Sequence, residues 1–107
     1  MAKKKGSPEL VTNAVKELLT FPANMCRGKL VIHNNYSSGL LYGISGADAD
    51  EKENLALEGG VPVNYEFIIE PGEKYVDDFP FPGKVFLVMD TAQTTKGVVY
   101  QAQWRTA

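Results

Sequence analysis

Residues 98–105, VVYQAQWR, alternate apolar and polar side chains, so that Val98, Tyr100, Ala102 and Trp104 share one side. Successive side chains of an extended strand point to opposite faces, whereas a helix turns about 100° per residue and would scatter both sets. The stretch therefore predicts a β-strand with one face in a core and the other in water.

Residues 61–70, VPVNYEFIIE, repeat this period of two. Their odd positions are apolar or aromatic, and their even positions are mostly polar. We expect one continuous strand here, with these side chains facing the core: Val61, Val63, Tyr65, Phe67 and Ile69.

Two shorter apolar runs, residues 29–35 and 40–45, flank a segment rich in Asn, Ser and Gly. Those residue types tolerate left-handed or side-chain-bonded backbone, and they are typical of tight turns. We expect the two runs to form a hairpin whose turn lies near residues 34–39.

Residues 84–90, KVFLVMD, are apolar in both phases, which predicts a strand buried on both faces. The tetrapeptide 70–73, EPGE, has Pro at its second and Gly at its third position, the preference of a type II turn. A short returning strand over residues 74–77 is expected to follow it.

The segment Val11–Phe21, between Pro8 and Pro22, fits two patterns. One set of apolar residues has helical spacing and another falls on one side of a strand: Leu10, Ala14, Leu18 and Phe21 against Val11, Val15, Leu19 and Phe21. The surrounding strands favour an extended segment, with a helix as the alternative.

Seven or eight short strands in about 95 residues, separated by Gly, Pro and Asn turns, predict an all-β fold: an antiparallel β-sandwich that is jelly-roll-like. The 107 residues fit one domain. We expect residues 1–8 to form a flexible basic arm and residues 9–107 a single sandwich domain. The acidic segment 47–54 is expected to be a loop at one end of the sandwich.

Composition excludes several classes of protein. The chain is 44% hydrophobic and 22% charged, which is ordinary for a globular domain. No apolar run approaches the roughly 20 residues of a membrane span, and no apolar segment follows the basic start as in a secretory signal. A single cysteine, Cys26, rules out an intrachain disulfide and a zinc site built from cysteines.

Charge is unevenly distributed along the chain. The net charge is −2, yet Lys3, Lys4 and Lys5 stand together at the start, which leaves 8 basic against 13 acidic residues after them. An acidic body argues against a nucleic-acid groove, which needs a continuous basic face to neutralise phosphates. We therefore expect neither a nucleic-acid nor a membrane partner.

The residues that could support catalysis are few. Cys26 lies beside Arg27, but His33 alone is thin support for a Cys–His pair. The acidic set Asp48, Asp50, Glu51 and Glu53 lacks the Gly hinge and the spacing of a calcium loop, and it reads as a solvated loop. We expect no enzymatic activity, no catalytic residues, no metal and no cofactor.

Two features remain as candidate contact sites. Tyr36 falls outside the inward phase of the strands, and residues 78–83, DFPFPG, form an apolar loop whose two prolines restrict the backbone. Such a loop loses little conformational entropy on binding and suits a contact with another protein through Phe79 and Phe81. The aromatic content leaves a carbohydrate-binding face as an alternative.

Residues 21–35, FPANMCRGKLVIHNN, resemble a pattern of small virion proteins of tailed bacteriophages: Pro-Ala-Asn, an arginine, then an apolar strand that ends in Asn-Asn. The similarity continues through the aromatic strand 41–44, the turn 71–73, the strand start 82–85 and the closing Gln-Trp at 103–104. It covers about residues 10–105. The acidic segment 47–54 and the Met25-Cys26 pair depart from the pattern.

This resemblance implies a β-sandwich capsid decoration (cement) protein that binds the outside of the shell and bridges neighbouring subunits. Its expected partners are the major capsid protein and itself, as a homodimer by preference or as a trimer, and its location is the capsid surface of the virion. The expected partner-binding residues are Lys3, Lys4, Lys5, Tyr36, Phe79 and Phe81. A carbohydrate-binding or fibre and tail adhesion module is the alternative.

Overall fold

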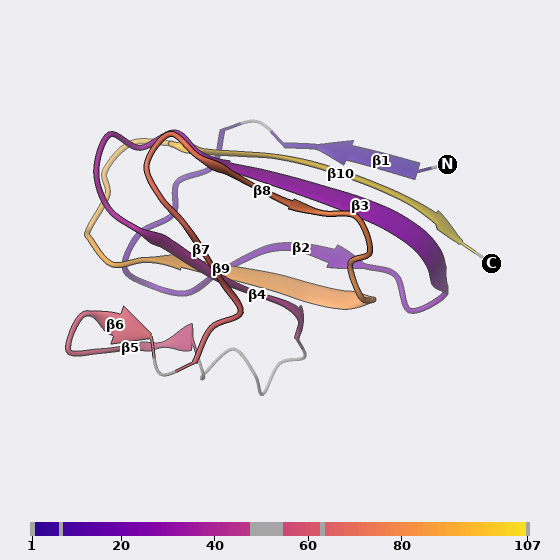
Figure 1. Cartoon of the computed structure of the whole chain (residues 1–107), viewed down its shortest axis with the longest axis horizontal. Helices are drawn as coiled ribbons and strands as arrows, with labels where there is room; N and C mark the ends of the chain where they lie inside the picture. Colours follow the sequence, from indigo (N-terminus) through magenta and orange to yellow (C-terminus); the bar gives the residue numbers. More distant parts are fainter. Residues whose placement is uncertain (1, 7, 48–54, 63, 107) are drawn as a thin grey trace.

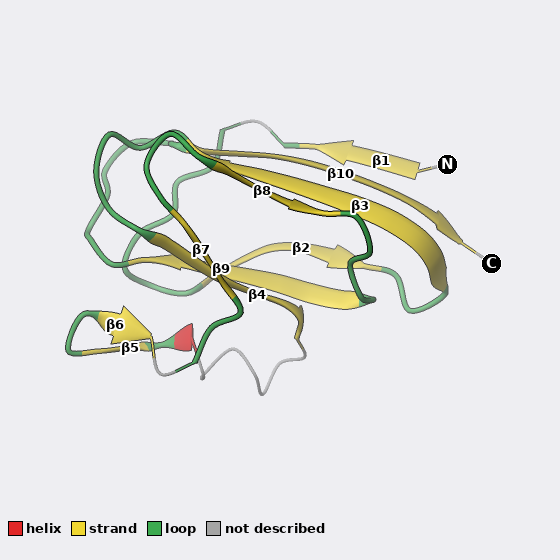
Figure 2. Cartoon of the chain, viewed as in Figure 1, coloured by secondary structure: helices red, strands yellow, loops and turns green. Residues whose placement is uncertain are grey.

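Two four-stranded antiparallel sheets lie face to face in the computed structural model, which describes residues 2–6, 8–47, 55–62 and 64–106 (Figures 1 and 2). The first sheet has the strand order β1 (Ala2–Lys5), β10 (Val98–Thr106), β3 (Met25–Asn34) and β8 (Lys74–Asp77). The second sheet has the order β2 (Lys16–Phe21), β9 (Gly83–Met89), β4 (Leu41–Ala47) and β7 (Phe67–Ile69). A small ribbon of β5 (Leu57–Glu58) and β6 (Val61–Pro62) lies below the second sheet in Figure 1.

The pairing of the eight main strands follows a simple rule. β1 pairs with β10, β2 with β9, β3 with β8 and β4 with β7, all antiparallel. This is the pairing of one long antiparallel ribbon, and rolling that ribbon brings β10 beside β3 and β9 beside β4. The arrangement is that of a jelly roll, so the predicted all-β, jelly-roll-like antiparallel sandwich is confirmed.

The core lies between the two sheets. β10 supplies Val98, Tyr100 and Ala102, all buried, which confirms the strand and the inward phase predicted for residues 98–105. Trp104 is half-buried at the end of the strand, where its ring meets Phe21 of the second sheet edge-on, with centroids 5.8 Å apart. Each buried side chain of this kind stabilises the fold by about 1.5–3 kcal/mol.

A second, smaller apolar cluster lies on the opposite side of the second sheet. Phe86 and Val88 of β9 point there and pack with Tyr42, Ile44 and Leu55. Leu57 of β5 packs against the same cluster, so the segment that contains β5 and β6 covers this outer face (Figure 1). β9 is therefore buried on both faces, as residues 84–90 predicted.

The predicted hairpin of residues 29–35 and 40–45 is wrong. β3 belongs to the first sheet and β4 to the second, so the connection between them crosses from one layer to the other. Both strands exist as predicted, but an apolar run and its turn do not specify the pairing partner. That partner is decided by the longer ladders that β3 forms with β10 and that β4 forms with β9.

The single strand expected over residues 61–70 is also wrong. Val61 and Pro62 pair with β5, while only residues 67–69 join the second sheet. Pro62 has no N–H to donate, which weakens a continuous ladder through this segment. Phe67 and Ile69 are buried as expected, whereas Val61 and Tyr65 are 50% and 40% exposed; Val63 lies outside the described residues.

The N-terminal residues do not follow the expectation of a flexible arm over residues 1–8. Residues 2–5 form β1, in register with residues 104–101 of β10. Beyond it, the Gly6 N–H donates to the Tyr100 carbonyl and the Glu9 N–H to the Val98 carbonyl, at 3.3 and 2.7 Å. The segment pairs with backbone N–H and C=O groups along the edge of β10. The run of lysines in the sequence gives no sign of this pairing.

Two local predictions are confirmed. Residues 16–21 of the ambiguous segment Val11–Phe21 are strand β2, whose Leu18, Leu19 and Phe21 are buried. The turn at residues 70–73 is closed by a hydrogen bond from the Glu73 N–H to the Glu70 carbonyl at 3.0 Å. Gly72 in this turn has φ +81°, the left-handed value that a type II turn requires at its third position.

Asn34 joins the two sheets at the end where the chain crosses between them. Its side chain is fully buried, and its Nδ2 donates to the carbonyls of Ile69 in β7 and Gly39 in the crossover, at 2.9 and 3.2 Å. Its Oδ1 accepts from the Tyr36 N–H at 3.1 Å. These three hydrogen bonds connect the end of β3 to the crossover and to β7 of the opposite sheet.

Replacing Asn34 with alanine would leave the Tyr36 N–H and the two carbonyls without these partners. Because an unsatisfied buried polar group costs about 1–3 kcal/mol, we expect Asn34→Ala to lower the unfolding free energy by about 2–4 kcal/mol in urea titrations. The exposed neighbour Asn35 is the matched control, and Asn35→Ala should change stability by less than about 0.5 kcal/mol. Equal effects of the two substitutions on stability would contradict the role of the Asn34 side chain in joining the two sheets.

Tyr75 of β8 stacks on Phe67 of β7, with ring centroids 4.0 Å apart and planes 8° from parallel. Burial of the phenol, and then the nearby carboxylates of Asp77 and Glu66, raise the pKa of Tyr75 to about 12. Burial likewise raises the pKa values of Tyr42 and Tyr100 above the ordinary value of 10. All three shifts favour the neutral phenol in the folded chain.

These shifts predict alkaline destabilisation. Above pH 10 the unfolded chain releases the phenolic protons that the folded chain retains, so the unfolding free energy should fall between about pH 10 and 12 and be unaffected by tyrosine ionisation below pH 9. Thermal unfolding followed from pH 8 to 12 measures this. Tyr75→Phe retains the stacked ring and should make the decline shallower; an unchanged decline would contradict the role of Tyr75.

Candidate functional site

The loop between β8 and β9 presents two phenyl rings to solvent. Phe79 is 84% exposed and Phe81 is 71% exposed, while Pro80 between them is buried. The Asp77 carboxylate accepts the Phe79 N–H at 3.0 Å, which fixes the start of the loop. Exposed rings on a restrained backbone are a preformed apolar contact, which we call the Phe79–Phe81 loop.

Close packing beneath this loop holds it in place. Pro80 lies against Gly28 of β3, where a Cβ atom would come within 3.2 Å of the proline Cγ. Phe81 lies against Gly46 in the same way, with its own Cβ 3.0 Å from the Cβ position of that glycine. Gly46 has φ +69°, so a side chain there would be strained as well as crowded. Two glycines thus give the loop room to sit close to the sheets.

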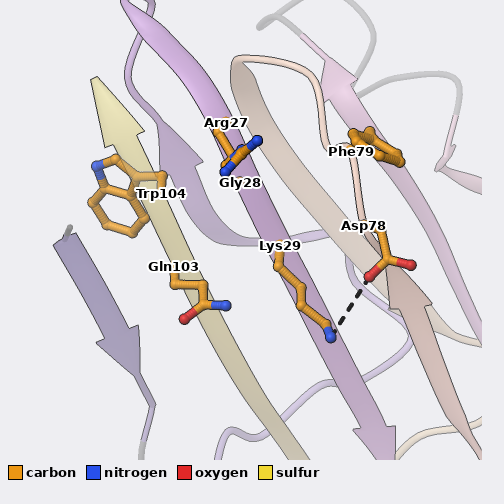
Figure 3. A pocket seen from close by; sticks show the side chains of 7 residues that line it. All are labelled: Arg27, Gly28, Lys29, Asp78, Phe79, Gln103 and Trp104. Atoms are coloured by element: carbon orange, nitrogen blue, oxygen red, sulfur yellow. Dashed lines mark ion pairs between the residues drawn. The ribbon is translucent and has the colours of Figure 1, made fainter. Parts of the chain in front are cut away.

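An open hollow of about 300 Å³ lies beside the loop (Figure 3). It extends from Trp104 and Gln103 on β10, across residues 27–29 of β3, to Asp78 and Phe79. The Lys29 ammonium and the Asp78 carboxylate form an ion pair across it at 3.6 Å. The hollow brings the amide of Gln103 and the charged groups of Arg27, Lys29 and Asp78 close to the exposed ring of Phe79.

The three lysines predicted from the sequence to bind a partner lie on β1. Lys3 is exposed and lies opposite Gln103, so the two side chains share a face of the first sheet. Lys4 and Lys5 occupy the register positions opposite Ala102 and Gln101. The three lysines are therefore part of a strand of the first sheet.

Tyr36 is not a surface residue, so the expectation of a contact site there is wrong. Its side chain is 6% exposed and belongs to the core between the sheets. Its hydroxyl accepts the Val11 N–H at 3.0 Å and donates to the Thr95 carbonyl at 2.7 Å. The phenol therefore ties three chain segments together. Tyr36 lies in an irregular connection, where side chains do not alternate between two faces, so its burial could not be predicted from the sequence pattern.

The reactive residues considered from the sequence do not converge. Cys26 is exposed and His33 is half-buried, and they lie seven positions apart on β3, which is about 23 Å along a strand. Within the described residues there is no group of three or more potential metal-ligating side chains. The acidic candidates Asp48, Asp50, Glu51 and Glu53 lie outside the described residues.

Neither family models nor curated proteins nor solved structures match this chain. In the part of the chain that the structure describes, no helix is long and apolar enough to span a membrane.

Sequence reasoning found the Phe79–Phe81 loop but missed the hollow and the polar side of the first sheet. Gln103, Arg27 and Lys29 come from strands far apart in the chain, and the β10–β3 register brings them together. The polar phase of residues 98–105 was the available signal, since Gln101, Gln103 and Arg105 alternate with the core residues. These polar positions predict a face in contact with solvent, but they do not predict which strand lies beside residues 98–105.

Proposed function

We propose that this protein is a virion structural protein that binds the outside of a tailed-bacteriophage capsid and stabilises the shell by bridging neighbouring subunits. The proposal rests on a binding surface rather than on a reaction. The observation that carries it is the Phe79–Phe81 loop, two highly exposed phenyl rings on a backbone held by Pro80 and by the Asp77 carboxylate.

Water-exposed phenyl rings supply binding energy when a partner covers them. Burying one such side chain is favourable by about 1.5–3 kcal/mol. The restrained loop adds to this because little backbone entropy remains to be lost on association. Aromatic anchors of this kind commonly dominate the energetics of protein interfaces.

The dimensions of the molecule are sufficient for a bridging role. Its broadest projection measures 41 by 27 Å, or roughly 1,100 Å², and a standard interface takes about 800 Å² from each partner. Modest contacts repeated over a symmetric shell reinforce one another through effective concentration. Pairing of the protein with a second copy, as a two-fold dimer by preference, would add to the same effect.

The test is titration of purified protein onto capsids of its own virus that were assembled without it. Wild type is expected to saturate them at a fixed stoichiometry. The double substitution Phe79→Ser and Phe81→Ser should weaken binding by at least tenfold, since two buried anchors are lost, while the unfolding free energy changes by less than about 1 kcal/mol.

Ile68 provides the control, because it is 42% exposed on β7, an edge strand of the other sheet. Ile68→Ser removes an exposed apolar group and should leave capsid binding unchanged. Wild-type protein that does not bind capsids would refute the proposed function. If the double variant binds capsids as tightly as wild type, the Phe79–Phe81 loop does not contribute to capsid binding.

The hollow beside Trp104 favours a second candidate function, a carbohydrate-binding or fibre and tail adhesion module. The exposed ring of Phe79 beside amide and carboxylate groups is suited to a sugar ring, and jelly rolls include lectin domains. Trp104 is the single tryptophan of the chain, so a sugar that enters the hollow should shift its fluorescence. A glycan array without hits, together with unchanged fluorescence, would dismiss this candidate.

A further inference from the structure

Most of the described basic side chains lie on the outer face of the first sheet. Lys16 and Lys84, which form ion pairs at the second sheet, are exceptions. The register aligns them in rows across the strands: Lys3 with Gln103, Gln103 with Lys29, Arg105 with Arg27, and His33 with Lys74. Directly opposed residues of an antiparallel pair point to the same face. We call the surface formed by Lys3, Arg27, Lys29, Lys74 and Arg105 the basic face.

The outward direction of these rows follows from the alternation of burial. On β10 the core residues are Val98, Tyr100 and Ala102, so the odd-numbered positions face outward. On β3 the core residues are Leu30 and Ile32, so positions 27, 29, 31 and 33 face outward. Lys3, Arg27, Lys29, Lys74 and Arg105 are all exposed.

Charge is strongly segregated between this face and the rest of the chain. Among the described residues, one of the five cations is in an ion pair: Lys29 pairs with the carboxylate of Asp78, which belongs to the same surface. The basic face therefore carries +4, and since the whole chain carries −2, the remainder carries −6. Elsewhere, Lys16 and Lys84 are held in ion pairs with Glu9 and Glu17 at 3.2 and 3.3 Å.

Arg27 and Arg105 lie directly opposite each other on neighbouring strands. Like charges in such a pair repel and destabilise the sheet. Within the described residues neither guanidinium has a carboxylate within 4.0 Å. A partner that brings carboxylates to this position would relieve the repulsion, so the pair is better suited to a complex than to the free protein.

The middle of the basic face carries apolar and amide groups. Val31 and Val99 are half-buried there, Val76 is 42% exposed, and Gln101 and Gln103 lie between the valines and the cations. An apolar centre with a charged rim is the anatomy of a protein interface. Single-stranded nucleic acid is bound instead by aromatic stacking platforms, and the outward positions of these strands hold Val, Gln, His, Lys and Arg.

The two sheets differ in what covers them. The outer face of the second sheet is closed by the segment that contains β5, through Leu55 and Leu57. The first sheet carries its charged rows on the side turned away from the core, and Phe79 stands at the edge of the same surface, across the hollow from Gln103 (Figure 3). The basic face and the Phe79–Phe81 loop thus meet at one end of the molecule.

We infer that the basic face is a docking surface for an acidic protein, one that presents carboxylates around an apolar patch. The inference rests on the proposed function, in which that acidic surface belongs to the capsid subunit. β1 contributes to it as a fixed edge strand that carries Lys3 into the rows, in place of a free basic arm.

The experiment compares capsid binding by wild type and by the double variant Arg27→Gln, Arg105→Gln at 50 and 500 mM salt. We expect about tenfold weaker binding at low salt and a difference that nearly disappears at high salt, because salt screens exposed charge pairs. The thermal stability of the free variant should be equal or higher, since the repulsion between the two guanidinium groups is gone. Lys96→Gln, an exposed cation in the loop before β10, is the control and should bind as wild type.

The outcomes separate this inference from the proposed function. If wild type and the double variant bind capsids equally well at low salt, the basic face is refuted while the capsid function stands. If wild type does not bind capsids, the capsid function fails. Fluorescence anisotropy with a single-stranded oligothymidylate tests the class of partner separately. We expect no binding, whereas binding that the double variant loses would identify a nucleic-acid surface and overturn the inference.

Discussion

The buried carboxamide of Asn34 is the constraint on which the arrangement of the two sheets depends. It is the last residue of β3, and from there the chain leaves the first sheet and crosses to the second. A crossover has backbone groups without ladder partners, and burying each of them unpaired would cost about 1–3 kcal/mol. Asn34 bonds the crossover at Gly39 and the opposite sheet at Ile69, and Tyr36 adds the chain segments at Val11 and Thr95.

Once this end is fixed, the remaining pairings follow from antiparallel ladders. The long β3–β10 and β4–β9 pairs lie at the centres of the two sheets, and β8, β1, β2 and β7 add at the edges. Apolar cover is unequal: a second cluster behind Phe86 and Val88 closes the second sheet, whereas the first sheet presents polar rows. This inequality leaves one broad face available for contact. The Phe79–Phe81 loop adds an apolar contact at its end.

Function, on this view, is a property of surfaces whose parts are distant in sequence. The hollow and the basic face draw on β1, β3, β10 and the segment after β8. Arg27 and Arg105 are 78 positions apart in the chain, and only the β10–β3 register makes them neighbours. The aromatic loop is different because Phe79, Pro80 and Phe81 are contiguous. For that reason its exposure and stiffness were visible in the sequence itself.

The sequence alone determined the all-β class, the inward phase of residues 98–105, the doubly buried strand 84–90 and the turn at Gly72, because side-chain alternation and turn chemistry are local properties. The tertiary structure decided which strands are neighbours. It separated β3 from β4, divided residues 61–70 between two sheets, fixed residues 2–5 along β10 and buried Tyr36. Strand pairing is a choice among edges that are locally equivalent. Backbone satisfaction and apolar burial over the whole molecule make that choice, so it leaves no mark on a single stretch of chain.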